Sequence, residues 1–165
     1  MSKLRKVISG GQTGVDQGGL AAALKLKIPI GGWAPRGFRC ENGVIPKKYA
    51  IHMKEAEVSN YPARTEMNVL EGDATLIYCS DISETKGTKL TIYMCKKHRK
   101  PWFDIVSETS LFSENEDGYQ HMANLLKEFE VLNVAGPRES GSPGIFDATK
   151  ARLYEIFIRI RYGGG

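Results

Sequence analysis

Three glycine-containing segments of this sequence combine flexible backbone with hydrogen-bond donors, the composition of an anion-binding loop. They are residues 9–16 (SGGQTGVD), 83–88 (SETKGT) and 136–142 (GPRESGS). Each precedes a helical pattern, so the positive end of a helix dipole would point at the same place. The segments therefore predict a pocket for a phosphorylated or oxyanionic small molecule. The ligand-binding candidates within them are Gly10, Gly11, Gln12, Thr13, Gly14, Asp16, Lys86, Gly87, Thr88, Gly136 and Arg138.

The guanidinium of Arg138 is planar and always charged, which suits the oxygens of phosphate or molybdate. Lys86 stands near the start of a predicted helix, where a cation is unfavourable unless an anion is close. Each feature also has a plainer interpretation. Arg138 taken alone could be a surface charge, and a glycine-rich turn after a first strand could simply be a tight turn.

A fourth segment, residues 31–39 (GGWAPRGFR), adds an aromatic ring and two arginines to bend-forming residues. It could fold over the edge of a sheet, with Trp33 stacking on a heterocycle and Arg36 meeting a phosphate. Alternatively, the segment is a surface excursion and Trp33 belongs to the core. Cys40, beside an arginine, is more readily interpreted as a bystander than as an activated thiol.

Carboxylates that could act as a general acid or base are few, and the catalytic residues stay unknown. Asp16 and Glu66 are the candidates, with Asp147 a third, although Asp16 could instead stabilise a helix N-terminus. No metal site is expected, because three cysteines without CxxC spacing and three isolated histidines form no ligand cluster.

The first loop matches neither common nucleotide motif. It lacks the lysine of GxxxxGK[ST], which argues against a P-loop ATPase. It also lacks GxGxxG spacing, and residues 31–34 (GGWA) place no acid after the second strand to hold a ribose. Hydride chemistry on NAD is therefore not expected.

The elements that must position these loops alternate between strands and helices, which is typical of βαβ units. The expected fold class is α/β, a single Rossmann-like three-layer domain with a mainly parallel sheet. Strands are expected over residues 6–9, from 28, and over 74–79, 101–106 and 131–135. Helices are expected over residues 15–26, 64–71, 88–97, 118–129 and 143–161. The stretch between residues 31 and 49 reads as loop-rich.

Size and charge limit the function classes. A chain of 165 residues suits one domain, expected over residues 1–162 with a flexible tail at 163–165. A net charge of +4 is too small and scattered for a nucleic-acid surface. No apolar run approaches the length of a membrane span, and the N-terminus has no signal region. We therefore expect a cytoplasmic protein that binds neither nucleic acid nor membrane.

The last predicted helix suggests association between copies of the chain. Ser142 offers a capping hydroxyl and Pro143 suits the first helical position. Beyond them, the apolar residues cover more than one stripe of the helix surface. Such a helix often packs against a partner subunit as well as its own sheet, so a homo-oligomer is expected.

Six ordered blocks give the chain a family resemblance over nearly its whole length. They are SGGQTGVD (9–16), GGWAPRG (31–37) with ENG (41–43) and IP (45–46), RTEMN (64–68), DATL (73–76), GTKLT (87–91) and NVAGPR (133–138). Together they resemble the family known as the putative molybdenum carriers, a circularly permuted YpsA-like branch of the SLOG superfamily. The resemblance implies a Rossmann-like fold related to molybdenum cofactor carriers and to LOG proteins, frequent homo-oligomers, and a nucleotide or molybdopterin-like ligand.

LOG enzymes cleave nucleoside monophosphates using a glutamate just after a Gly-Thr loop. Here Thr88 is followed by Lys89, Leu90 and Thr91, with no carboxylate. The leading hypothesis is therefore a carrier for molybdenum cofactor, molybdate or a related phosphorylated heterocycle. The alternatives are a LOG-like nucleotide phosphoribohydrolase, which could recruit Asp16 or Glu66, and a nucleotide-sensing or purely structural oligomer.

Overall fold

A five-stranded parallel sheet forms the centre of the computed structural model, which describes residues 2–58, 60–80, 86–106 and 115–163. The strand order is β2-β1-β9-β7-β8, and each neighbouring pair is parallel. The strands are β1 (Lys6–Ile8), β2 (Ile30–Gly31), β7 (Ala74–Cys79), β8 (Trp102–Val106) and β9 (Val131–Ala135). All six residues of β7 are buried, which explains its mostly apolar sequence, since helices cover both faces of such a sheet.

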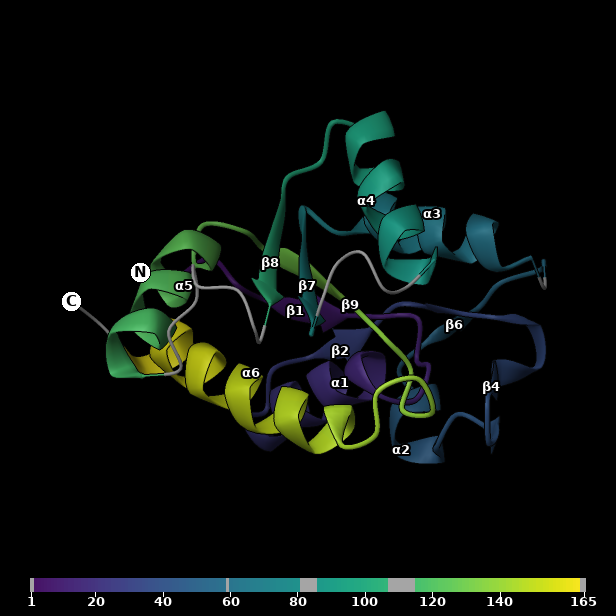
Figure 1. The fold of residues 1–165 in the computed structure, drawn as a ribbon, viewed down its shortest axis with the longest axis horizontal. Coiled ribbons are helices and arrows are strands. Elements are labelled where there is room, and N and C mark those ends of the chain that lie inside the picture. The colour runs from purple at the N-terminus through teal and green to yellow at the C-terminus, as the bar shows by residue number, and fades with distance from the viewer. Residues whose placement is uncertain (1, 59, 81–85, 107–114, 164–165) are drawn as a thin grey trace.

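Helices form a layer on each side of the sheet (Figure 1). One layer contains α1 (Val15–Lys25), α5 (Glu116–Leu126) and α6 (Ile145–Tyr162), and the other contains α3 (Tyr61–Glu71) and α4 (Lys86–Lys97). The predicted α/β three-layer architecture with its parallel sheet is confirmed. Each predicted strand and helix falls within a few residues of an observed one.

The segment between β2 and α3 was expected to be mostly loop, and it contains short paired strands instead. β3 (Trp33–Ala34) pairs with β6 (Lys54–Glu55), and β4 (Arg39–Cys40) pairs with β5 (Gly43–Val44). A 3₁₀ turn (Arg36–Phe38) and the short helix α2 (Lys47–Ala50) complete it. These elements lie beside the sheet, so the segment extends the edge near β2 (Figure 1).

The starts of α3 and α6 differ from the prediction for identifiable reasons. Helix α3 begins at Tyr61, three residues early, because the side chain of Asn60 accepts a hydrogen bond from the Ala63 N–H. The predicted Ser142 cap of α6 is wrong. The carboxylate of Glu139 accepts hydrogen bonds from the Gly144 and Phe146 N–H groups instead, at 2.5 and 2.9 Å. A carboxylate satisfies these free donors and also favours the positive end of the helix.

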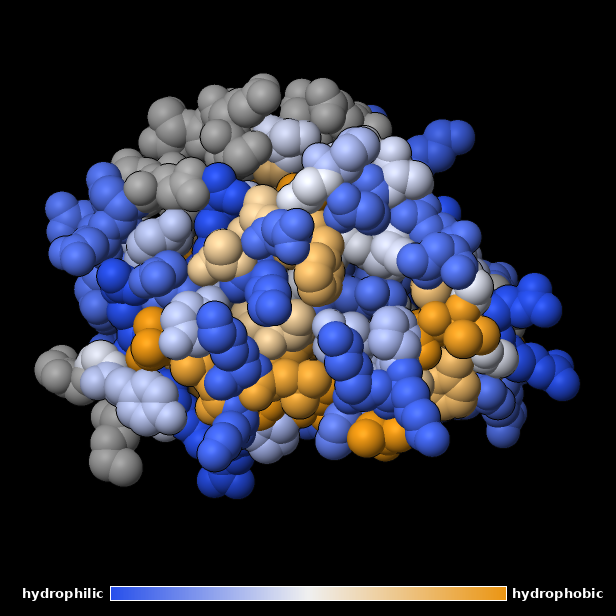
Figure 2. Space-filling model, turned by 90° about the horizontal axis from the view of Figure 1, so that it is seen from below, coloured by the Kyte–Doolittle hydropathy of each residue, from blue (hydrophilic) through white to orange (hydrophobic). Residues whose placement is uncertain are grey.

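Helix α6 buries one side against the sheet and α1 and leaves further apolar groups near the surface. Leu153, Ile156 and Phe157 are fully buried, whereas Phe146 and Ile158 are only partly buried. Figure 2 shows apolar residues gathered between charged ones on this face of the molecule. Among the described helices, none combines the length and the apolar character needed to cross a membrane.

Candidate functional site

The carboxyl ends of β1, β9 and β7 meet where the chain changes direction across the sheet. From β1 the chain moves outward to β2, whereas from β7 it moves the other way to β8, and β9 lies between β1 and β7. Loops that diverge at such a point leave a crevice, which is where open parallel sheets bind ligands. The loops that follow β1 and β9 both reach this crevice, together with the first turn of α4.

The crevice has two connected parts. The inner pocket has a volume of about 30 Å³ and is lined by Gly10, Asp16, Tyr61, Arg64, Thr65, Asn68, Gly87, Thr91, Asn133, Val134, Ala135 and Gly136. The outer cleft has a volume of about 420 Å³ and is lined by Tyr61, Lys86, Gly87, Leu90, Gly136, Pro137, Arg138 and Gly141. The two parts share Tyr61, Gly87 and Gly136.

A buried pair of opposite charges lies at the base of the inner pocket. Nη1 of Arg64 is 3.9 Å from Oδ2 of Asp16, and the two side chains are 5% and 10% exposed. The same Nη1 donates a 2.8 Å hydrogen bond to the Gly10 carbonyl, and the guanidinium stacks 4.6 Å from the ring centre of Tyr61. Nε of Arg64 is buried without a hydrogen-bond partner among the described residues. The arginine therefore joins helix α3 to the first glycine loop.

Asp16 is a carboxylate with an unusual proton affinity. Burial raises its pKa from 3.8 to about 6, because the charged form loses its water. The Arg64 guanidinium and the Gln12 N–H, which donates to Oδ2 at 3.2 Å, oppose this rise without cancelling it. Arg138 lowers the pKa of Asp16 further, so its cation acts on the same carboxylate from the outer cleft. A carboxyl group tuned in this way within a cleft is a functional-site candidate.

The outer cleft is cationic. Of the described residues that line it, Lys86 and Arg138 carry positive charge and none carries negative charge. In the described part of the chain, the guanidinium of Arg138 makes no hydrogen bond or ion pair, so it is available to an anion. Tyr61, Leu90 and Pro137 add apolar surface. Cations beside apolar groups suit a ligand that carries an anionic group on an organic ring.

A network around Glu41 holds the Arg138 loop against the first loop. The carboxylate of Glu41 accepts hydrogen bonds from the Thr13 hydroxyl and from both the N–H and the hydroxyl of Ser140. The Glu139 N–H in turn donates to the Thr13 hydroxyl at 3.2 Å. Burial opposes the charge on Glu41, but the hydrogen bonds outweigh it and hold its pKa below the ordinary value. Both residues that follow Arg138 are therefore anchored.

Two glycines let the loops approach closely. Gly14 has a φ of 80°, and a Cβ there would lie 2.4 Å from the Pro137 carbonyl oxygen. A Cβ on Gly136 would lie 2.2 Å from the carbonyl oxygen of Tyr78. No larger residue fits either position without moving backbone. The first and third loops thus pack directly on each other.

Six of the candidates predicted from sequence meet at the crevice: Gly10, Asp16, Lys86, Gly87, Gly136 and Arg138. Residues 83–85 of the second predicted loop lie outside the described part of the chain. Gly11, Gln12 and Thr13 support the first loop instead. Gly11 packs against Ile45 and Met53, while Gln12 and Thr13 bind the segment that carries Glu41. Gly14 packs on the third loop, and Thr88 is buried behind the lining.

Trp33 and Arg36 do not line either part of the crevice. Trp33 lies in β3, half-buried, with Nζ of Lys54 5.1 Å from its ring centre. The backbone N–H of Trp33 donates to the Asn68 side chain and its carbonyl accepts from it, so Trp33 contacts a residue that lines the inner pocket. Arg36 is exposed in the 3₁₀ turn. Cys40, in β4, donates to Asn42.

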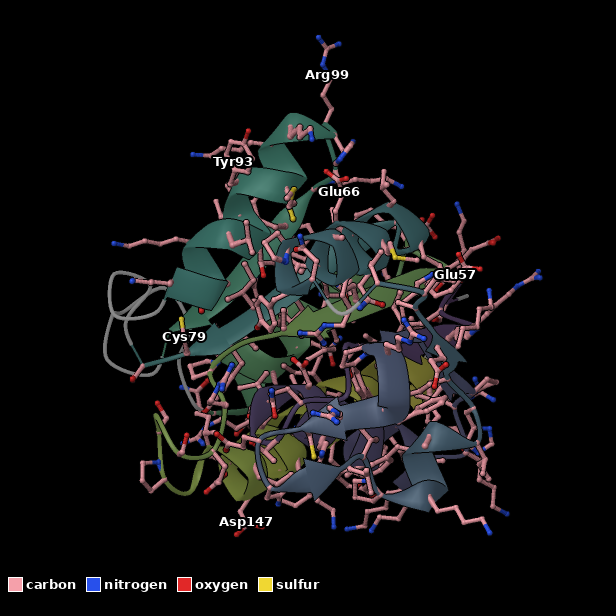
Figure 3. All side chains as sticks on the ribbon, turned by 90° about the vertical axis from the view of Figure 1, so that its right-hand side faces the viewer. Glu57, Glu66, Cys79, Tyr93, Arg99 and Asp147 are labelled. Atoms are coloured by element: carbon pink, nitrogen blue, oxygen red, sulfur yellow. The ribbon has the colours of Figure 1, made fainter. Side chains whose placement is uncertain are left out.

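The other candidate acids lie elsewhere. Glu66 is on the outer side of α3, where it pairs with Lys97 at 2.9 Å and His98 at 3.0 Å. Hydrogen bonds from His98 and Lys97 lower the pKa of Glu66, so it is a poor proton donor. Asp147 lies in a separate groove beside Glu41 and Phe146. Figure 3 shows Glu66 and Asp147 at opposite ends of the molecule, so of the three candidate acids Asp16 alone lies in the crevice.

Sequence reasoning assigned no role in the site to four lining residues of α3: Tyr61, Arg64, Thr65 and Asn68. Arg64 and Asn68 are four residues apart, so they share one face of the helix. The available signal for a role in the site was an arginine and an asparagine on the inner face of an amphipathic helix, because such residues are mostly exposed and are buried mainly where they have polar partners. Among the described residues, no group of three histidine, cysteine or acidic side chains is placed to hold a metal ion.

An open parallel sheet flanked by helices, with a cationic crevice at its carboxyl edge, defines a Rossmann-like protein. Residues 7–157 match the circularly permutated YpsA SLOG family, and the chain belongs to that family. The chain is also similar to a solved structure from Syntrophus aciditrophicus SB, described as a "putative molybdenum carrier protein". The two are 36% identical with a TM-score of 0.82, over 95% of this chain and 96% of the other. A comparison with curated proteins finds no match.

Proposed function

We propose that this protein is a carrier that binds molybdenum cofactor, molybdate or a related phosphorylated heterocycle, with molybdenum cofactor the leading candidate. The observation that carries the proposal is that Lys86 and Arg138 both line a cleft whose described lining has no acidic residue. The cleft volume of about 420 Å³ falls in the range of small-molecule sites. The description of the similar Syntrophus protein supports the molybdenum-containing cargo.

The ligand-binding residues in this proposal are Gly10, Asp16, Lys86, Gly87, Gly136 and Arg138, with Tyr61, Arg64 and Asn68 added from α3. Gly87 stands in the first turn of α4, and the N-terminal end of a helix favours an anion. The Glu41 network keeps the loop of Arg138 in place before a ligand arrives. Such preorganisation reduces the entropy lost on binding.

Titration calorimetry with AMP, as a phosphorylated heterocycle, and with molybdate tests the proposal. Arg138→Ala should weaken AMP binding about tenfold to a hundredfold, since hydrogen bonds to charged groups contribute about 1.5–3 kcal/mol. Arg5→Ala is the matched control, because Arg5 is exposed and precedes β1 at the opposite edge of the sheet. If both variants bind AMP and molybdate as the unmodified protein does, the outer cleft is not the site. Molybdenum analysis of the protein purified from its source tests the cargo directly.

A second candidate function is hydrolysis of the N-glycosidic bond of a nucleoside monophosphate. The observation in its favour is Asp16, whose pKa of about 6 suits proton transfer near neutral pH. Incubation with AMP followed by chromatography for adenine tests it. Release of adenine that Asp16→Asn abolishes supports an enzyme, and intact AMP after prolonged incubation supports a carrier.

The proposal extends to the oligomeric state of the protein and to its location in the cell. The partly buried apolar residues of α6 support a homo-oligomer, which sedimentation at several protein concentrations would detect. Three free cysteines, two of them buried, suit the reducing conditions of a cytoplasm.

A further inference from the structure

The two parts of the crevice differ in net charge. In the inner pocket the cation of Arg64 faces the carboxylate of Asp16 at 3.9 Å and is already hydrogen-bonded to Gly10. An anion placed there would meet a carboxylate and a cation whose charge is already balanced. The described lining of the outer cleft has two cations and no carboxylate. An anionic group is therefore stabilised in the outer cleft and opposed in the inner pocket.

The inner pocket is also too small for an oxyanion. A site needs about 10–15 Å³ of this volume for one water-sized group. The pocket's volume of about 30 Å³ thus accepts about two such groups. A tetrahedral phosphate or molybdate has four oxygens around a central atom and does not fit. An amino or hydroxyl group at the end of a larger ligand does.

The amide and hydroxyl donors of the inner pocket are largely used within the protein, whereas Nε of Arg64 is buried there without a partner among the described residues. The amide of Asn68 donates to the carbonyls of Trp33 and Arg64, and the amide of Asn133 donates to the Thr75 hydroxyl. The Thr91 hydroxyl donates to the Gly87 carbonyl at 3.0 Å. These side-chain donors already have partners within the protein.

Asp16 differs from these residues. The Gln12 N–H and the Gly10 backbone use only part of the acceptor capacity of its carboxylate, which has about four acceptor positions, and the side chain lines the pocket. An ionised carboxylate only accepts hydrogen bonds. The hydroxyls of Tyr61 and Thr65 can serve in either direction.

We infer that the ligand enters with an uncharged hydrogen-bond donor, an amino or hydroxyl group, in the inner pocket against Asp16, and with its anionic group in the outer cleft between Lys86 and Arg138. This inference rests on the proposed function and narrows its ligand. It selects a phosphorylated organic molecule with a donor at the end remote from the phosphate, and it disfavours free molybdate or phosphate as the complete ligand. Asp16 is then the residue that determines specificity.

Calorimetry with four ligands tests this inference: AMP, its analogue without the exocyclic amino group, its 2′,3′-dideoxy analogue, and inorganic phosphate. The unmodified protein should bind AMP about tenfold more tightly than at least one of the two analogues that lack donors, because that analogue leaves the carboxylate unpaired. In Asp16→Asn this preference should disappear. Asp147→Asn, an aspartate in the first turn of α6 outside the crevice, should retain the preference.

The outcomes separate this inference from the function on which it rests. If AMP binds, depends on Arg138, and both analogues bind equally well, the donor selection is wrong and the proposed function stands. If no phosphorylated ligand binds in a manner that depends on Arg138, both are wrong. The comparison of analogues uses the unmodified protein, so it remains decisive even if Asp16→Asn folds poorly.

Discussion

The buried carboxylate of Asp16 should make the stability of the protein fall as pH rises, and Asp16→Asn should remove that dependence. Asparagine has nearly the same shape and can still accept the hydrogen bond from the Gln12 N–H. Because asparagine is uncharged, its burial does not remove water from a charged group. Arg64 would keep its bond to the Gly10 carbonyl but lose its charged neighbour at 3.9 Å.

The size of the effect follows from the pKa of Asp16. Folding raises it from 3.8 to about 6, so at intermediate pH the folded state binds more protons than the unfolded chain. The free energy of unfolding should then decline from the unfolded pKa upward and level off above the folded one. A rise of about 2 pKa units corresponds to about 3 kcal/mol in total. The attraction of Arg64 already contributes to this pKa, so the loss of that charged neighbour in the variant is part of the same figure.

Urea unfolding of the unmodified protein and of Asp16→Asn between about pH 4 and pH 8 measures the effect. The stability of the unmodified protein minus that of the variant should fall by about 2.5 kcal/mol over this range, with most of the change below about pH 7. Other titrating groups contribute equally to both proteins and cancel. Asp147→Asn, at an exposed aspartate, serves as the control. A difference that stays flat with pH, or rises, would refute the account of a carboxylate that is destabilised by burial.

Three further outcomes are expected. Glu41→Gln should speed amide hydrogen exchange at residues 139–144 by about tenfold, because its carboxylate anchors that loop; Glu57→Gln, at an exposed side chain, should leave exchange unchanged. Gly136→Ala should destabilise the protein by about 2 kcal/mol or more in thermal unfolding, since its Cβ would overlap a backbone carbonyl. Gly141→Ala in the same loop has room for a Cβ, so a similar loss there would contradict the explanation. Glu66→Gln should leave AMP affinity within about twofold in calorimetry, because that carboxylate faces Lys97 and His98.

The fold was largely predictable because its signals are local. The buried strand β7 is apolar except for Thr75, and glycine follows β1 and β9 where the backbone must turn or approach another segment closely. These patterns depend on neighbouring residues alone, so they can be read without tertiary contacts. The start of α6 was misread, because a side chain outside the expected capping position supplies the cap: Glu139 replaces Ser142.

The site was predictable only in part. Three loops at one edge of a parallel sheet follow from the alternation of strands and helices, and they brought Asp16 and Arg138 to the same crevice. The same reasoning gave Thr13 a ligand-binding role, yet its hydroxyl binds Glu41. Composition identifies donors but does not reveal whether another part of the protein already uses them.

The amino-acid sequence by itself determined the class of fold, the loops that face the crevice and the need for glycine at their turns. Only the tertiary structure decided which charges meet there. Arg64 contacts the Gly10 carbonyl across 54 residues of chain, and Glu41 contacts Ser140 across 99. Such contacts depend on strand order and on the face that a helix turns inward, neither of which local periodicity specifies. For that reason Arg64, which was not a candidate from the sequence, lines the crevice, whereas the candidates Arg36 and Glu66 do not.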